Sequence, residues 1–337
     1  MFCYADEGSI STSIDSSCLR MTNEKSRKMK ILITGSNGLL GQKLVYKLRN
    51  QNNIACIATA RGENRLVKRD GYMYDSLDIT NKQNVETVFA KHLPDVIINT
   101  AAMTNVDACE TDRENAWLMN ASAVEHQVKT LEDLKKKHPS YNPHFIHLST
   151  DFIFDGTHGP LDENEKPNPL SYYAETKLEA EKIVQASELD WAIARTVLVF
   201  GIVDNMSRSN IVLWVKSNLE QGKTINVVDD QFRTPTLAED LADGCTLIAQ
   251  KRAKGIYNIS GKDFYSILEL ANTVADYYGL DKNLIKPSKS ADIKQPAKRP
   301  PITGFIIDKA VNELGYNPHS FTEGIKILEE QMKEMGK

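Results

Sequence analysis

Hydrophobic positions from Lys30 onward form short apolar runs, which alternate with longer stretches where apolar residues recur every three or four positions. The first pattern is typical of strands buried on both faces, and the second of amphipathic helices. Strands are predicted over residues 30–34, 54–58, 95–99, 145–148 and 191–199. Helices are predicted over residues 39–50, 116–137 and 171–186. Strands that alternate with helices imply crossover connections, so the predicted fold class is α/β, with a doubly wound parallel sheet.

The pattern changes past Gly201, where Pro, Asp and Lys become frequent. Residues 286–301 form a long, polar, proline-containing connection. We therefore predict a sheet domain over residues 29–200 and a smaller C-terminal substrate-binding lobe, formed mainly by residues 201–337. A return to the sheet domain is expected near residues 235–250.

Composition places the chain among ordinary globular proteins. Of its 337 residues, 41% are apolar and 26% charged, so a large core is expected without disulfides. The net charge of −4 favours neither nucleic acid nor a membrane as partner, and no apolar run approaches the ~18 residues of a membrane helix. Five scattered cysteines without CxxC or metal-ligand spacing predict a reducing, cytoplasmic compartment and no metal. Residues 1–28 are acidic where a secretory signal is apolar, and are predicted to be a disordered leader.

A glycine-rich turn, TGSNGLLG, follows the first predicted strand and opens the first predicted helix. Gly35, Gly38 and Gly41 would permit the tight turn, the approach of backbone to a pyrophosphate, and close packing of helix on strand. The free N–H groups at the helix start would face the phosphates. The alternative is an ordinary tight turn, but the strand–turn–helix context favours a Rossmann-like dinucleotide site. The predicted cofactor-binding segment also includes Asn37, Leu39 and Leu40.

The residues after the second predicted strand bear on the identity of the dinucleotide. An acidic residue is expected there for NAD, but the strand ends in the sequence ATAR. The guanidinium of Arg61 would meet the 2′-phosphate of NADP, so NADPH is the predicted cofactor and NADH the alternative. The competing interpretation makes Arg61 a solvated loop residue. Asp78 and Ile79, after the next predicted strand, are candidate adenine contacts.

A candidate catalytic set combines Tyr173 and Lys177, one helical turn apart, with Thr150 at the end of a buried strand. Reduction of a ketone requires a hydride, and a proton for the developing alkoxide. A tyrosine pKa of about 10 is high for this task, and lowering it by about 3 units requires ~4 kcal/mol. A lysine ammonium about 4 Å away would supply that amount at an effective dielectric near 20. Thr150 would hold the substrate oxygen beside the phenol.

Each of these residues also has an ordinary structural interpretation. Tyr173 would be a packed aromatic and Lys177 a surface lysine, because the YxxxK pattern is common by chance. Its combination with the glycine turn, in the expected order along the chain, favours the catalytic interpretation. His144 and His147, three apart on a predicted strand, face opposite sides and are interpreted as packing residues.

Seven segments occur in a characteristic order along the chain. They are TGSNGLLGQKL, NTAAMTNVDACE, LSTDFIFDG, YAETKLEAE, VVDDQFRTPT, GIYNISG and KRP. Individually each is weak, but as an ordered set they resemble the extended short-chain dehydrogenases/reductases, and among these the dTDP-4-dehydrorhamnose reductase group. The resemblance runs from about Met29 almost to the C-terminus.

The resemblance implies NADPH-dependent reduction of a 4-keto group on a nucleotide-activated deoxysugar, as in dTDP-rhamnose and polysaccharide biosynthesis. It gives Thr150, Tyr173 and Lys177 the catalytic roles, and Asn120 the place of an asparagine that maintains the active-site helix. A homodimer is the candidate assembly. Cofactor contacts are implied at Ala101, Ala102 and Met103. Substrate contacts are implied at Thr104, Asp151, Asn210 and Arg299, the last two toward the diphosphate.

Three departures from the group's pattern leave the identity of the sugar open. Leu198 stands where the group has tryptophan, Arg233 where glycine is usual, and Asn258 where the group has histidine. The resemblance places these positions in regions that touch the sugar or its phosphate. They do not alter the residues of hydride chemistry.

Two other functions remain as alternatives. A nucleotide-sugar dehydratase would carry an Asp–Glu pair after the catalytic threonine, but Asp151 and Phe152 follow Thr150, and an epimerase usually has an acid after the second strand. The other alternative is a non-catalytic NADP-binding subunit, similar to the regulatory β subunit of methionine adenosyltransferase. Retention of the three catalytic residue types argues against a degenerate site without excluding this alternative.

Overall fold

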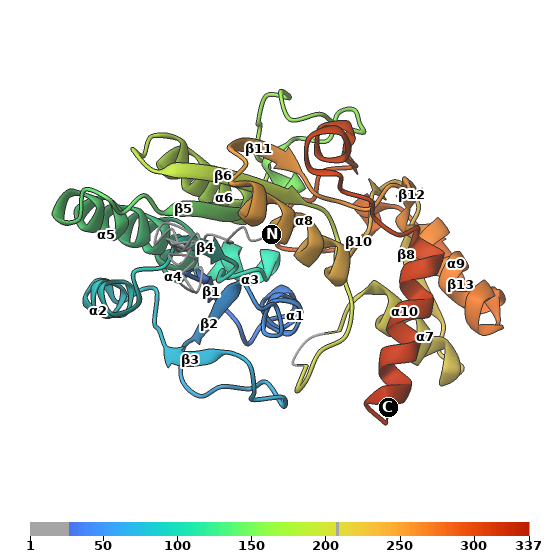
Figure 1. The fold of residues 1–337 in the computed structure, drawn as a ribbon. Coiled ribbons are helices and arrows are strands. Elements are labelled where there is room, and N and C mark those ends of the chain that lie inside the picture. Colours follow the sequence, from blue (N-terminus) through green and yellow to red (C-terminus); the bar gives the residue numbers. More distant parts are fainter. Residues whose placement is uncertain (1–26, 207–208, 337) are drawn as a thin grey trace, which may run out of the picture.

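The structure is a computed structural model that describes residues 27–206 and 209–336, so residues 1–26 of the predicted leader lie outside the described residues. Its centre is a seven-stranded parallel sheet with the order β11-β6-β5-β4-β1-β2-β3 (Figure 1). These strands are β1 (Met29–Thr34), β2 (Ile54–Ala60), β3 (Met73–Ser76), β4 (Val96–Asn99), β5 (His144–Thr150), β6 (Asp190–Thr196) and β11 (Gly255–Asn258). The strand order reverses between β1 and β4, which confirms the predicted α/β, Rossmann-like, doubly wound fold.

Helices cover both faces of the sheet, because its strands carry apolar side chains on both sides. In β1, Ile31 and Ile33 belong to one core and Leu32 to the other, as the alternation of side chains along a strand requires. The first core includes α1 (Leu39–Leu48) and α8 (Ala238–Lys251). The second includes α2 (Lys82–His92), α5 (Ala123–Lys137) and α6 (Tyr172–Gln185).

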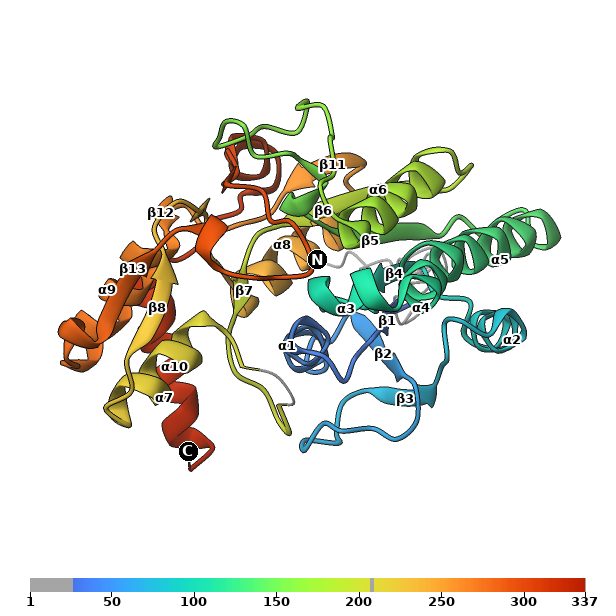
Figure 2. The ribbon, with the colours of Figure 1, turned by 180° about the vertical axis from the view of Figure 1, so that it is seen from behind.

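A smaller lobe with its own core lies beside the sheet domain and is drawn in yellow to red in Figures 1 and 2. Its helices are α7 (Ile211–Glu220), α9 (Ile267–Tyr278) and α10 (Phe321–Glu334), and its parallel strands are β8 (Ile225–Val228) and β13 (Ile285–Ser288). The remaining short strands are β7 (Val199–Phe200), β9 (Phe232–Arg233), β10 (Thr236–Leu237), β12 (Tyr265–Ser266) and β14 (Ile302–Thr303). They pair as β10–β7 and β12–β9–β14. Within the described ranges, none of the helices combines the length and apolar character of a membrane span.

Three elements differ from the sequence-based expectation. The predicted helix over residues 116–137 is interrupted by a π-helical turn at Leu118–Ser122, preceded by α3 (Val106–Thr111) and α4 (Arg113–Trp117). A spacing of three and four residues does not distinguish such a turn from a continuous α-helix. The predicted strand over residues 191–199 is split, because Leu198 adopts a φ of 39°. The predicted connection over residues 286–301 begins inside β13.

The π-helical turn places Asn120 against α6, the helix that carries Tyr173 and Lys177. Its Nδ2 donates to Thr176 Oγ1 at 3.0 Å and to the Met103 carbonyl oxygen at 3.1 Å. Its Oδ1 accepts from the Met103 N–H at 2.8 Å. One buried amide therefore ties α6 to the segment that follows β4.

A buried ion pair fixes α6 to the sheet. Arg195 on β6 donates from Nε to Glu181 Oε1 at 3.0 Å and from Nη2 to Glu181 Oε2 at 2.7 Å. The Arg195 side chain is 3% exposed and that of Glu181 is fully buried. Because the pair is bidentate, it sets the orientation of the helix as well as its distance from the sheet.

The ion pair predicts a large stability loss when one partner is removed. Glu181→Ala leaves the Arg195 guanidinium buried without its carboxylate, which is expected to lower the free energy of unfolding by about 3–5 kcal/mol. Urea denaturation measures this change. Glu179→Ala, on the exposed side of the same helix, is the control and should change stability by less than about 1 kcal/mol. A loss below that control value in Glu181→Ala would contradict the assigned role.

Candidate active site

The glycine turn between β1 and α1 is too crowded for side chains. Gly35 has a φ of 70°, and a Cβ there would lie 2.9 Å from the Ala101 backbone. A Cβ on Gly41 would lie 2.3 Å from the Gly35 carbonyl oxygen. Gly38 begins α1, and no side chain among the described residues caps it. The turn therefore leaves backbone N–H groups at the helix start, which fits a pyrophosphate group.

Asn37 joins this turn to the loop that follows β2. Its Nδ2 donates to the Glu63 carbonyl oxygen at 2.9 Å, and its Oδ1 accepts from the Arg65 N–H at 2.9 Å. The same loop lines a hollow of about 490 Å³ that includes Arg61, Arg65 and Arg69. Arg65 and Arg69 were not among the predicted cofactor residues, although their spacing of four residues from Arg61 onward, after a strand end, was a signal for them.

The remaining predicted cofactor residues follow strands β1, β3 and β4 at the carboxyl edge of the sheet. They are Leu39, Leu40, Asp78, Ile79, Ala101, Ala102 and Met103. The Asp78 carboxylate accepts from the N–H and hydroxyl of Thr80, at 3.0 and 2.7 Å. Ile79 is 4% exposed and packs in the core with α2, so only its backbone can face a ligand.

The structure brings the three predicted catalytic residues to the same edge. Thr150 ends β5, Tyr173 lies in the first turn of α6, and Lys177 lies one turn further on. The Thr150 hydroxyl lies beside the Tyr173 phenol and lowers the pKa of that phenol. The ring of Phe152 packs edge-on against Tyr173, with 6.1 Å between the ring centres. The phenol is thus held beside the threonine hydroxyl at the end of the strand.

Lys177 is buried, and its ammonium is held by β5. Its Nζ donates to the Leu148 carbonyl oxygen at 2.5 Å and lies 3.2 Å from His147 Nε2. On its other side, His147 Nδ1 lies 3.1 Å from Asn99 Nδ2. His147 is thus more than the packing residue predicted for it, and no local pattern indicates its contact with Lys177, because the two are 30 positions apart.

Burial dominates the protonation of both residues. It lowers the pKa of Lys177 to about 8, with the Glu181 charge opposing this change. Burial raises the pKa of the Tyr173 phenol above its usual value, and the hydrogen bond with Thr150 opposes this change. The expected lowering of the phenol pKa by the ammonium is not found, because the ammonium is held by the Leu148 carbonyl group.

The predicted substrate residues have different surroundings. Asn210 caps α7, since its Oδ1 accepts from the N–H groups of Val212 and Leu213 at 3.1 and 3.2 Å. Arg299 pairs with Asp107 at 2.7 Å, and this guanidinium lowers the pKa of the Asp107 carboxyl. Thr104 is exposed, and Asp151 is buried in a polar network. Their roles toward a substrate remain predictions.

Comparison with known proteins assigns the family. Residues 29–334 match the family model of the RmlD substrate binding domain. The chain belongs to this family. It is therefore an NAD(P)H-dependent oxidoreductase of the extended short-chain dehydrogenase/reductase type, in the dTDP-4-dehydrorhamnose reductase group.

Three relatives illustrate the breadth of this family. The probable low-salt glycan biosynthesis reductase Agl14 of Haloferax volcanii is 29% identical over 89% of this chain and 97% of its own length. Methionine adenosyltransferase 2 subunit beta of Bos taurus is 29% identical over 77% of this chain and 75% of its own. The dTDP-4-dehydrorhamnose reductase of Bacillus anthracis, solved in complex with NADP, is 25% identical, covers 90% of this chain and 99% of its own, and superposes with a TM-score of 0.77.

The buried ammonium predicts that Lys177→Met stabilises the protein at pH 7. The folded-state pKa of about 8 lies below the usual 10.5, so wild-type stability rises with pH between these values. At pH 7 the free energy of unfolding of the variant should exceed that of the wild type by about 1–3 kcal/mol. At pH 9.5 this difference should be smaller by about 2 kcal/mol. Urea denaturation at both pH values tests this. Lys182 is exposed on the same helix, so Lys182→Met should show no such pH-dependent difference in stability. If both variants changed stability equally with pH, burial of the Lys177 ammonium would not be the cause.

Proposed function

We propose that this protein reduces a 4-keto group on a nucleotide-activated deoxysugar with NADPH, in a reaction of the kind that supplies dTDP-rhamnose. The observation that carries the proposal is the meeting of Thr150, Tyr173 and Lys177 at the carboxyl edge of the sheet, where the glycine turn also lies. Open parallel sheets bind their ligands at this edge, at the point where the strand order reverses. The dTDP-4-dehydrorhamnose reductase of Bacillus anthracis supports the substrate class.

The protein's own residues then act on the oxygen of the substrate carbonyl. NADPH, when bound, supplies the hydride for the carbonyl carbon. Tyr173 Oη donates a proton to the developing alkoxide, and its raised pKa keeps that proton in place near neutral pH. Thr150 positions the same oxygen beside the phenol. Lys177, with a pKa of about 8, exchanges its proton close to neutrality.

The preference for NADPH over NADH rests on the loop after β2. The strand ends without an acidic residue, and three arginines of the following loop line one hollow. Guanidinium groups suit a phosphate monoester because they donate paired hydrogen bonds in a plane. The hydrogen bonds of Asn37 hold this loop next to the glycine turn, where the adenosine half of a dinucleotide would lie.

A non-catalytic binding subunit is the second candidate function. The observation in its favour is the 29% identity to methionine adenosyltransferase 2 subunit beta of Bos taurus. The complete Thr–Tyr–Lys set favours catalysis. Consumption of NADPH with dTDP-4-keto-6-deoxysugars distinguishes the two, because a binding subunit would take up the cofactor without oxidising it.

Tyr173→Phe tests the proposed reaction directly. The variant lacks the acidic proton, so kcat should fall by about 100-fold to 10,000-fold while NADPH still binds. The measurement is the decrease in NADPH absorbance, with cofactor binding followed by fluorescence. Tyr172→Phe is the matched control on the neighbouring tyrosine, and its kcat should stay within a few fold of the wild type. Activity of Tyr173→Phe within tenfold of the wild type would contradict the acid role.

Arg61→Asp tests the choice of cofactor. A carboxylate in place of the guanidinium would repel a 2′-phosphate and accept hydrogen bonds from a ribose, so preference should move from NADPH toward NADH. The ratio of kcat/KM for the two cofactors is the readout. Arg113→Asp changes an exposed arginine that does not line the hollow and should leave the ratio unchanged. An unaltered ratio in Arg61→Asp would remove this residue from the cofactor site.

A further inference from the structure

A row of three buried polar side chains crosses the central sheet from the glycine turn toward the lysine of the candidate catalytic set. Thr34 ends β1 directly before Gly35, Asn99 ends β4, and His147 lies on β5. The strand register places Thr34 opposite Asn99, and Asn99 opposite His147. Each of the three is at most 1% exposed, so their polar groups must be paired within the protein.

The Thr34 hydroxyl sets the direction of the hydrogen bonds along this row. Its Oγ1 accepts from the Ala101 N–H at 3.4 Å and lies 2.6 Å from Asn99 Oδ1. Residues 27–206 and 209–336 offer this hydroxyl no other acceptor, so its one proton goes to Oδ1. Asn99 Nδ2 then faces His147 Nδ1 at 3.1 Å, and because an amide nitrogen only donates, Nδ1 must accept.

The proton of the His147 ring is thereby placed on the nitrogen that faces Lys177. Burial lowers the pKa of His147 well below its usual value, so the ring is neutral and carries a single N–H. With Nδ1 accepting, this is Nε2–H, 3.2 Å from Lys177 Nζ. An uncharged amine accepts this hydrogen bond through its lone pair and still donates to the Leu148 carbonyl oxygen. An ammonium has no lone pair, so two donors would face each other.

The opposite direction of the row suits an ammonium but leaves one buried group unpaired. For Lys177 to donate to His147 Nε2, the ring proton must move to Nδ1, and the Asn99 amide must turn its oxygen toward the ring. Asn99 Nδ2 would then donate to Thr34 Oγ1, and the Thr34 hydroxyl proton would lose its acceptor. A buried donor without a partner is costly, so the Thr34 hydroxyl favours the first direction.

We propose that Thr34, Asn99 and His147 are positioning residues that favour the uncharged amine of Lys177 and so make its proton easier to release. This inference rests on the proposed function, in which Tyr173 donates its proton to the substrate oxygen. The phenolate that remains takes up a proton released from Lys177 Nζ, so an O–H bond forms as an N–H bond breaks. The amine left behind is the form that the row stabilises, and it regains a proton from solvent between turnovers.

The charges around Lys177 are compatible with this assignment. Burial is the main cause that lowers the pKa of Lys177 to about 8, and the row acts in the same direction. Among the described residues, the opposing charge is that of Glu181 on α6, whose carboxylate is also bound by Arg195 of β6. His147 on β5 is neutral, and so is Tyr173, since burial raises the pKa of its phenol.

Thr34→Val tests the proposal, because it removes the hydroxyl and preserves the shape of the side chain. Without that hydroxyl the Asn99 amide can turn at no cost to Thr34, so the pKa of Lys177 should rise by about one unit. A ¹³C NMR titration of the Lys177 Cε, assigned with Lys177→Met, measures the change. Thr34→Ser keeps the hydroxyl and should titrate like the wild type. Thr59→Val is the matched control, since the buried Thr59 Oγ1 donates to the Ile33 carbonyl oxygen outside the row, and it should leave this pKa unchanged.

The pH profile of kcat and the tautomer of His147 give two further readouts. The alkaline fall of kcat, where Lys177 has lost its proton, should move upward by the same amount in Thr34→Val and stay in place in Thr59→Val. In the wild type at about pH 9.5, ¹⁵N NMR should find the His147 proton on Nε2.

Three results would overturn the proposal: an unmoved Lys177 titration in Thr34→Val, a loss of kcat that is equal at every pH, or a His147 proton on Nδ1 at high pH. The two NMR measurements need no turnover. If the wild-type enzyme oxidises NADPH with no 4-keto sugar nucleotide, the proposed function fails, and these measurements alone decide whether the row governs the charge of Lys177.

Discussion

The burial of the Lys177 ammonium beneath α6 is the interaction on which the rest of the site depends. A lysine in this position loses most of its hydration, and the lowered pKa of its ammonium expresses that cost. Its direct partner is the Leu148 carbonyl oxygen of the central strand β5. This contact requires α6 to lie close to β5 at Lys177, so the position of the helix and the protonation of the lysine are set together.

Two buried contacts hold α6 in that position, and they come from different elements. The bidentate pair of Glu181 and Arg195 fixes the helix to β6, and Asn120 ties Thr176 to the segment after β4. A buried ion pair is seldom more stabilising than apolar packing of the same volume. Its value here is directional, because fork-shaped hydrogen bonds restrict the rotation of the helix that carries the phenol and the ammonium.

The sequence predicted the sheet, the glycine turn and the positions of the candidate catalytic residues on β5 and α6, because these features depend on local patterns. An apolar run, the spacing of the glycines and the YxxxK motif can each be recognised within a few consecutive residues. The contact of His147 with Lys177 and the π-helical turn at Leu118–Ser122 could not be predicted, since each depends on how distant segments pack. The prediction that the Lys177 ammonium lowers the pKa of the Tyr173 phenol was wrong for a related reason. The spacing of the two residues does not reveal where the ammonium points.

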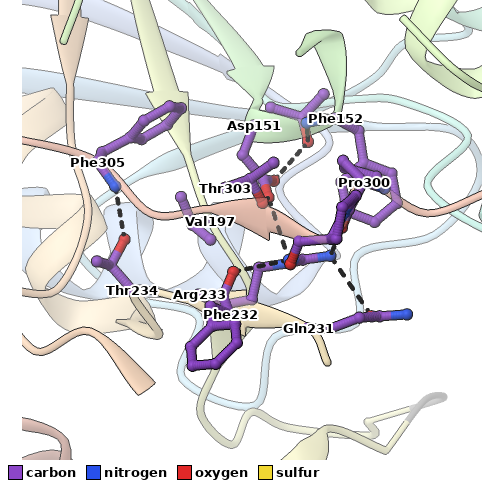
Figure 3. A network of polar contacts seen from close by, with 12 residues as sticks. Asp151, Phe152, Val197, Gln231, Phe232, Arg233, Thr234, Pro300, Thr303 and Phe305 are labelled. Atoms are coloured by element: carbon purple, nitrogen blue, oxygen red, sulfur yellow. Dashed lines mark hydrogen bonds and ion pairs between the residues drawn. The ribbon is translucent and has the colours of Figure 1, made fainter. Parts of the chain in front are cut away.

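Arg233 is one of the positions where this chain departs from its group, and it lies where the smaller lobe meets the end of β5 (Figure 3). Arg233 donates to the carbonyl groups of Pro300 and Pro301, while Arg299 pairs with Asp107 in the sheet domain. The segment around residues 299–301 is therefore joined to β9 by Arg233 and to α3 by Arg299. Glycine at position 233 would leave the carboxylate of Asp151 without its buried cation. Because that cation contacts Asp151 and none of the candidate catalytic side chains, the substitution changes the charge next to Thr150 while leaving the candidate catalytic set unchanged.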